Sequence, residues 1–336
     1  MEAAVVSFRL GGTDGVSVEA AKWQWALREL GLGVRTVAGA GPVDVLVPGL
    51  ERGAGTPAVA EVAAAVEGAD LVVVENLLSL PLNPGAAAVV ATVLAGRPAI
   101  VRHHDLAWQR PELRVPTGWP PTDRSWLHVT INGASRNQLA ATGIEATCRY
   151  NRFPTAGWEG RRRLTRAELG LEGTVVLHPV RAIPRKEVAA AARLAAGLGA
   201  TYWLSGPAED GYGPELARVL AEASCPWLHQ SVESVADAYA ASDAVCLTSS
   251  IEGFGNPVVE SALARRPLAI RRYPVAEELA AFGFRWFAAS DPGPLRRFLA
   301  EPDAALLDHN HDLAVAHFGL DRLPAELSEL LERVLP

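Results

Sequence analysis

Lysine, methionine and cysteine are scarce in this sequence, and the scarcity of cysteine limits its chemistry. The three cysteines, Cys148, Cys225 and Cys246, occur in unrelated contexts and form no CxxC pair. An odd number of isolated cysteines does not predict a disulfide framework, so we expect a reducing compartment. The sequence therefore predicts a cytoplasmic protein.

An excess of basic charge and a long apolar run are also missing. The net charge is −7, whereas a nucleic-acid-binding surface needs a basic face, so we expect no nucleic-acid partner. No apolar run reaches the roughly 18 residues of a transmembrane helix. Met1 leads into a predicted strand without a basic leader or a cleavage signal, so we do not expect secretion. Peripheral membrane contact and the oligomeric state stay open.

The chain does have ample apolar surface and enough length for two domains. Its 336 residues, 49% of them apolar, suit two ordered domains of about 150 residues each. Residues 3–8 predict a buried strand, 9–15 a glycine loop, 16–30 a helix and 34–37 a second strand. This order opens a doubly wound α/β domain.

Strands and helices alternate again after a linker that begins near residue 151. We therefore predict two Rossmann-like domains, one over 1–151 and one over 152–318. The last segment, 319–336, is predicted as a helix that could pack back on the N-terminal domain. The fold class is α/β with two doubly wound sheets.

The stretch 248–264 carries the strongest candidate site. It follows the apolar run 244–247, which predicts a buried parallel strand. Two glycines then precede Asn256, a predicted N-cap, and Pro257, which suits the first helical position. Bare N–H groups and the helix dipole make such a helix start an anion site.

Two carboxylates bracket this loop, Glu252 before it and Glu260 on the predicted first helical turn. Either could be a solvated surface charge, but a carboxylate beside a phosphate site is costly unless it has another task. Accepting hydrogen bonds from hydroxyl groups is such a task. A nucleotide-sugar, which is anionic and rich in hydroxyls, would suit both features.

Arg181 and Lys186 lie in a short loop after the predicted strand 174–178. Two fixed cations could neutralise a nucleoside diphosphate without a metal, and we prefer this interpretation to an ordinary basic loop. Arg185 is a weaker candidate, because it could point to solvent. In the first half, Gly11 and Gly12 could let the backbone approach a phosphate. The spacing around them does not match the GxGxxG dinucleotide fingerprint, and they could form a plain turn.

His103, His104 and Asp105 end a predicted strand, where α/β sheets bind ligands. Adjacent residues on an extended segment point to opposite sides, so we expect one histidine to be structural. A metal site would need further ligands at suitable spacing, and none is found. Trp23, Trp25 and Trp108 could line an acceptor pocket, but core packing is the simpler expectation for each.

These residues together resemble the retaining GT-B glycosyltransferases of family 4. Glu252 and Glu260, with Gly-Phe-Gly after the first, look like that family's E-x7-E signature. Arg181 and Lys186 match its R-x4-K pair, and Gly11-Gly12 looks like its N-terminal glycine loop. The resemblance covers nearly the whole chain, in order. It departs at Arg265-Arg266, where the family commonly has glycine.

The resemblance implies a GT-B fold, with two Rossmann-like domains facing across a cleft, and a hexosyltransferase activity. The N-terminal domain would hold a hydroxyl acceptor and the C-terminal domain a nucleotide-sugar, UDP- or GDP-linked, without a metal or other cofactor. Transfer would proceed by front-face attack, with the departing phosphate accepting the acceptor's proton. The implied site residues fall into three groups. The candidate catalytic residues are Glu252, His104 and His103; those for the diphosphate are Arg181, Lys186, Gly11 and Gly12; those for the sugar and nucleotide are Glu260, Gly253, Phe254, Gly255 and Asn256.

Two alternatives stay open. A GT-B-fold epimerase would turn over a nucleotide-sugar without an acceptor, and a non-catalytic protein would only bind one. A phosphorylase, which needs a cofactor lysine, is disfavoured because only Lys22 and Lys186 are present.

Overall fold

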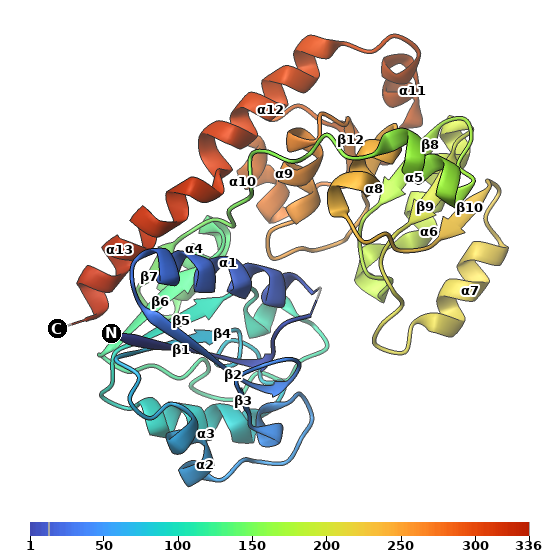
Figure 1. Ribbon diagram of the computed structural model, residues 1–336. Coiled ribbons are helices and arrows are strands. Elements are labelled where there is room, and N and C mark those ends of the chain that lie inside the picture. The colour runs from blue at the N-terminus through green and yellow to red at the C-terminus, as the bar shows by residue number, and fades with distance from the viewer. Residues whose placement is uncertain (13, 336) are drawn as a thin grey trace. The chain divides into compact units, whose positions relative to one another are not determined.

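The chain folds into two compact α/β units, Met1–Arg152 with Leu320–Pro336, and Phe153–Gly319. This computed structural model describes residues 1–12 and 14–335 (Figure 1). The C-terminal helix α13 (Leu323–Val334) belongs to the first unit, where Arg152 forms an ion pair with Glu326 on that helix. Among the described residues, no helix is long and apolar enough to cross a membrane.

The first unit contains a fully parallel seven-stranded sheet in the order β3-β2-β1-β4-β5-β6-β7. The strands are β1 (Glu2–Arg9), β2 (Gly33–Ala40), β3 (Val45–Leu46), β4 (Leu71–Glu75), β5 (Ala99–His103), β6 (Trp126–Thr130) and β7 (Ala146–Cys148). Central strands read as continuous apolar runs because both faces of the sheet are covered. The strand order reverses between β1 and β4, so the loops after these strands lie at the topological switch point.

Helices cover both faces of this sheet. They are α1 (Gly15–Glu29), α2 (Val59–Ala65), α3 (Pro84–Leu94) and α4 (Gly133–Ala141), together with α13 and the 3-10 turns Pro48–Leu50 and Ala107–Gln109. α1 and α13 share one hydrophobic cluster, whereas α2 and α3 share the cluster on the other face (Figure 1). Within α1, Trp23 is buried and Trp25 is 37% exposed. Ala20, Trp23 and Leu27 form part of the buried stripe of this helix.

The second unit contains a parallel six-stranded sheet in the order β10-β9-β8-β11-β12-β13. Its strands are β8 (Val175–His178), β9 (Thr201–Leu204), β10 (Trp227–His229), β11 (Ala244–Leu247), β12 (Leu268–Ile270) and β13 (Phe287–Ala288). The order reverses between β8 and β11, which pair directly. Their following loops therefore lie at this unit's switch point.

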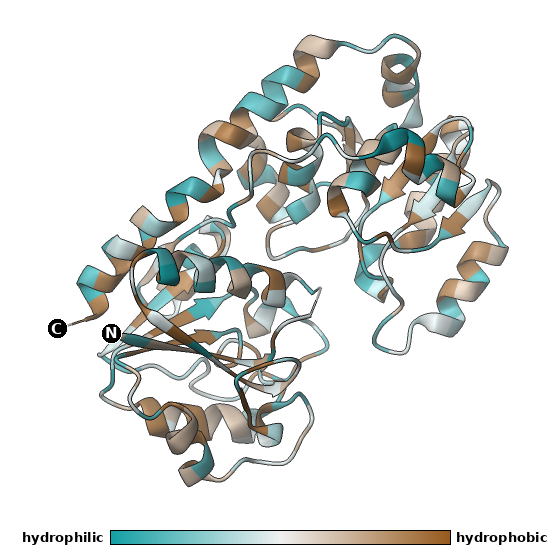
Figure 2. Cartoon of the chain, viewed as in Figure 1, coloured by the Kyte–Doolittle hydropathy of each residue, from teal (hydrophilic) through white to brown (hydrophobic). Residues whose placement is uncertain are grey.

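The helices of the second unit are α5 (Arg162–Leu169), α6 (Val188–Leu198), α7 (Gly213–Ala221), α8 (Val235–Ala241), α9 (Asn256–Leu263), α10 (Pro274–Ala280), α11 (Pro292–Ala300) and α12 (Ala304–Phe318), with the 3-10 turn Pro184–Lys186. The 3-10 turn Leu320–Arg322 belongs to the first unit. Hydrophobic and hydrophilic residues both occur along α12 (Figure 2). Ala314 and Phe318 are among its buried residues. The prediction of two doubly wound α/β domains is confirmed by the two sheets.

Candidate functional site

The strongest cluster of charged side chains lies in the second unit, after β8 and β11. Arg185 and Lys186 follow β8, in the turn Pro184–Lys186, and Glu252 follows β11. Because these parallel strands are neighbours, their carboxyl ends bring the two loops together. Residues 66 positions apart in the sequence thus meet at one edge of the sheet.

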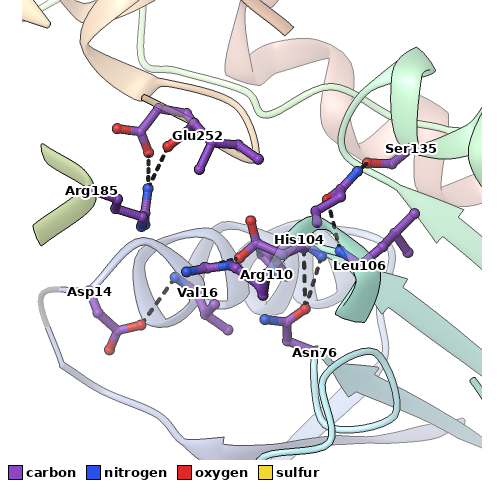
Figure 3. Close-up of polar contacts among 12 residues, drawn as sticks. Asp14, Val16, Asn76, His104, Leu106, Arg110, Ser135, Arg185 and Glu252 are labelled. Carbon is purple, nitrogen blue, oxygen red and sulfur yellow. Dashed lines mark hydrogen bonds and ion pairs between the residues drawn. The ribbon is translucent and has the colours of Figure 1, made fainter. Parts of the chain in front are cut away.

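Glu252 joins the two cations. Lys186 Nζ donates to Glu252 Oε1, and Arg185 Nη1 donates to Glu252 Oε2 at 2.8 Å and to the Ile251 carbonyl at 2.8 Å (Figure 3). Arg185 therefore does not point to solvent, which corrects that expectation. Arg181 lies nearby but pairs with Glu209, at 2.7 Å. The expected pair Arg181 and Lys186 is thus divided between two carboxylates.

Burial and charge act in opposite directions on this cluster. Lys186 and Glu252 are each only 8% exposed. Burial lowers the pKa of Lys186 to about 8, although Glu252 opposes that change. Burial alone would raise the pKa of Glu252, but Lys186 and Arg185 outweigh it and hold that pKa at about 2. Both groups are therefore charged at pH 7.

The loop from Gly253 enters α9 through Gly255. Gly255 has φ 94°, and a Cβ there would meet the Tyr273 hydroxyl at 2.1 Å, so only glycine fits. This glycine is the N-cap, and Asn256 is the first helical residue, which corrects the predicted N-cap. The left-handed backbone of Gly255 starts the helix without a side-chain cap.

Glu260 and Phe254 differ in what they offer a ligand. Glu260 lies just beyond the first turn of α9, one helical position later than expected, and its Oε2 accepts a hydrogen bond of 2.6 Å from the Tyr239 hydroxyl. The ring of Phe254 is buried; it stacks on Phe153 and packs edge-to-face against Phe318. The expected binding contribution of Phe254 is thus limited to its backbone.

In the first unit, Gly11 and Gly12 follow β1 and precede α1. Gly11 has φ 76°, and a Cβ there would meet Pro42 at 2.5 Å, so local packing already explains this glycine. Asp14 caps α1, because its carboxylate accepts from Val16 N at 3.1 Å (Figure 3) and from Ser17 N at 3.2 Å. A diphosphate contact at Gly11 and Gly12 stays a prediction.

His103 and His104 have different partners. His103 is fully buried, with Nδ1 at 2.7 Å from Ser79 Oγ and Nε2 at 2.9 Å from His128 Nδ1. Burial holds the pKa of His103 well below its usual value, so this imidazole is neutral. His104 Nε2 lies 2.6 Å from Glu75 Oε2, and its backbone N–H donates to Asn76 Oδ1 at 3.1 Å (Figure 3).

Sequence reasoning missed Glu75, which fixes the orientation of His104. Glu75 is fully buried and accepts a 3.0 Å hydrogen bond from Arg102, whose guanidinium lies 4.3 Å from the Trp23 ring. Burial would raise the pKa of Glu75, but Arg102 and His104 outweigh it and lower that pKa. Because ionised Glu75 only accepts hydrogen bonds, His104 Nε2 carries the proton of this contact. The position of this carboxylate directly after the apolar run 71–74 is the sequence signal that could have identified Glu75.

The tryptophans proposed for an acceptor pocket have separate surroundings. Trp23 lies in the core, as the simpler expectation held. Trp25 is partly exposed on α1. Trp108 Nε1 donates to Gln138 at 2.8 Å, next to the Gln109 side chain.

Comparisons with known proteins match this architecture along its length. No protein-family model matches the chain. HepE of Anabaena, solved in complex with UDP-glucose, is 21% identical and aligns over 99% of this chain and 100% of its own, with a TM-score of 0.80. Sucrose-phosphate synthase from Thermosynechococcus elongatus is 14% identical, over 99% and 98%, with a TM-score of 0.77. The fold is GT-B.

A curated sequence relative carries the comparison from fold to enzyme class. Mannosylglucosylglycerate synthase of Petrotoga mobilis is 25% identical over 84% of this chain and 85% of its own. This relative confirms the predicted enzyme class, glycosyltransferase. The membership in family 4 and the stereochemical outcome stay predictions.

Proposed function

We propose that this GT-B glycosyltransferase transfers a sugar from a UDP-sugar to a hydroxyl acceptor with retention of configuration. The observation that carries the proposal is the cluster of Arg185, Lys186 and Glu252, beside the glycine loop that opens α9. A parallel sheet binds ligands at this edge, and cations beside a helix start suit a diphosphate.

Lys186 is the residue that we assign to the diphosphate most directly. An ammonium group has three N–H donors, and Glu252 is the one acceptor recorded for Lys186 Nζ among the described residues. Lys186 can therefore keep its contact with Glu252 while it donates to a phosphate oxygen. Arg181, which is only partly buried, would supply a second cation to the same diphosphate.

The carboxylates would hold the neutral parts of the donor. Glu260, steadied by the Tyr239 hydroxyl, would accept hydrogen bonds from the ribose hydroxyls. Glu252, with Gly253, Gly255 and Asn256 beside it, would face the donor sugar. UDP is favoured over GDP because HepE, similar in fold, is solved with UDP-glucose.

The proposed reaction needs no protein nucleophile and no metal. The acceptor oxygen bonds to the anomeric carbon on the face from which the phosphate departs. The bond between the anomeric carbon and the phosphate oxygen breaks. The acceptor's proton passes to the departing phosphate, whose negative charge Lys186 and Arg181 offset. His104, held by Glu75 through Nε2, is the histidine that we assign to a donor-sugar hydroxyl; His103 is assigned a structural role.

Thermal-shift measurements with UDP, GDP, ADP and their sugars test the donor site, because a ligand that binds the folded state raises Tm. We expect UDP and UDP-sugars to raise Tm in the wild type, and Lys186→Ala and Glu260→Ala to abolish most of that rise. Unchanged UDP binding in both variants would overturn the assignment. Turnover of a UDP-sugar by epimerisation without an acceptor would contradict the transferase proposal. Loss of turnover in EDTA would contradict independence from metals.

A further inference from the structure

A cavity of about 250 Å³ lies in the second unit, at the far end of α9 from the glycine loop. Its lining comes from the segment after the linker, from the C-terminal end of α9 and from α12. The lining residues are Thr155, Trp158, Glu159, Leu263, Ala264, Arg265, Arg266 and His311. An eight-residue helix is about 12 Å long, so these residues form a site separate from Lys186 and Glu252.

Arg266 brings positive charge to this cavity. Its Nε donates to the Tyr239 carbonyl at 2.9 Å, and its Nη2 donates to the Ala240 carbonyl at 3.1 Å. Among residues 1–12 and 14–335, no carboxylate lies within ion-pair distance of Arg266. Burial and the neighbouring Arg162 lower the pKa of Arg266, and Asp243 opposes them. Because the hydrogen-bond partners of Arg266 are neutral carbonyl groups, a bound anion would further stabilise its positive charge.

Arg265 adds a second guanidinium on a strained backbone. Its φ of 50° lies in the left-handed region, which disfavours any residue with a Cβ. Its Nε donates to Asp308 at 2.9 Å, and its Nη2 lies 3.3 Å from His311 Nδ1. The arginine therefore strains the local backbone, and glycine at this position would remove that strain.

The rest of the lining suits hydroxyl groups and a sugar ring. Glu159 offers carboxylate oxygens and Thr155 offers a hydroxyl, while Trp158 offers an aromatic surface. The volume is below the roughly 300–1,000 Å³ of pockets for drug-sized ligands, so it fits a small metabolite. We propose that this cavity binds a phosphorylated sugar or polyol, with the phosphate on Arg265 and Arg266 and the hydroxyls on Glu159 and Thr155.

Calorimetric titration with glucose 6-phosphate, inorganic phosphate and glucose tests this site. We expect wild-type protein to bind glucose 6-phosphate at least about tenfold more tightly than either smaller probe, because both halves of the cavity contribute. No binding of glucose 6-phosphate at millimolar concentration, or equal affinity for inorganic phosphate, would overturn the proposal.

Matched variants assign the binding to the cavity. Arg266→Met and Arg265→Gly are expected to weaken glucose 6-phosphate binding at least about tenfold. Arg265→Gly relieves the left-handed backbone, so misfolding does not explain its loss of binding. Arg218→Met, on the exposed face of α7, removes an arginine away from the cavity, and it is expected to bind normally.

Lys186→Met separates this proposal from the donor site. It is expected to lose UDP binding and to keep glucose 6-phosphate binding. Loss of glucose 6-phosphate binding in Lys186→Met, with binding retained in Arg265→Gly and Arg266→Met, would place the ligand at the donor site and overturn the proposal. If the wild type does not bind UDP, that result would contradict the proposed donor site and would leave the proposed cavity site unaffected.

Discussion

Replacing Lys186 with methionine should separate stability from nucleotide binding. The pKa of Lys186 falls from 10.5 to about 8, so its charged form costs the fold about 3 kcal/mol at about 1.4 kcal/mol per pH unit. The pKa of Glu252 falls from 4.5 to about 2, a gain of about 3 kcal/mol by the same conversion. Lys186→Met removes the cost of burying the charged lysine. It removes only part of the stabilisation of ionised Glu252, since Arg185 still pairs with Glu252. We expect the free energy of unfolding at pH 7 to change by less than about 1 kcal/mol.

The same substitution should strongly weaken UDP binding. A hydrogen bond from a charged donor contributes about 1.5–3 kcal/mol, which corresponds to an affinity loss of roughly 10- to 150-fold. Calorimetric titration with UDP measures this loss, and denaturant unfolding measures the stability. Lys22→Met is the matched control, since Lys22 pairs with Glu19 in the first unit. UDP affinity within threefold of the wild type would refute the reasoning, as would an equal loss in the control.

The remaining predictions concern pH and two side-chain contacts. The stability of the wild type should rise relative to Lys186→Met between pH 8 and 10.5, because there the unfolded state holds a proton that folded Lys186 has lost; denaturant unfolding across this range measures it. UDP affinity should fall above about pH 8, by up to about tenfold per pH unit, as Lys186 becomes neutral, and titrations with Lys186→Met should lack this slope. Tyr239→Phe should weaken UDP binding by about 0.5–1.5 kcal/mol, because Glu260 loses one hydrogen bond; calorimetry that finds no loss would count against Glu260. Glu75→Ala should lower the free energy of unfolding by about 1.5–3 kcal/mol, because buried Arg102 loses its 3.0 Å ion pair and keeps only the 3.6 Å pair with Glu19, and a loss below about 0.5 kcal/mol would contradict that pairing.

Strands could be predicted from the sequence because parallel strands buried on both faces are continuous apolar runs. The run 244–247 coincides with β11, and 174–178 overlaps β8. β10 was missed because Trp227 and His229 at its ends are exposed. An edge strand lacks the two-sided burial on which the prediction depends.

The site could be predicted only in part, because spacing reports local neighbours. Arg181, Lys186 and Glu252 were found from the loops that follow two apolar runs. The sequence did not predict that Arg181 and Lys186 pair with different carboxylates. The Lys186–Glu252 contact spans 66 residues and the Arg181–Glu209 contact spans 28. The same limit hid Tyr239, which reaches Glu260 from another helix. Partners distant in sequence depend on strand order, which periodicity does not specify.

The scarcity of lysine makes the central claim directly measurable. Only Lys22 and Lys186 occur in the chain, so protein labelled with 13C at lysine Cε should give two lysine signals. Titrating both signals by NMR, with and without UDP, measures each pKa. We predict a pKa of about 8 for Lys186 in the free protein, a rise of at least about 1 unit when UDP binds, and no change at Lys22. UDP binding that leaves the Lys186 titration unchanged would contradict its assignment to the diphosphate.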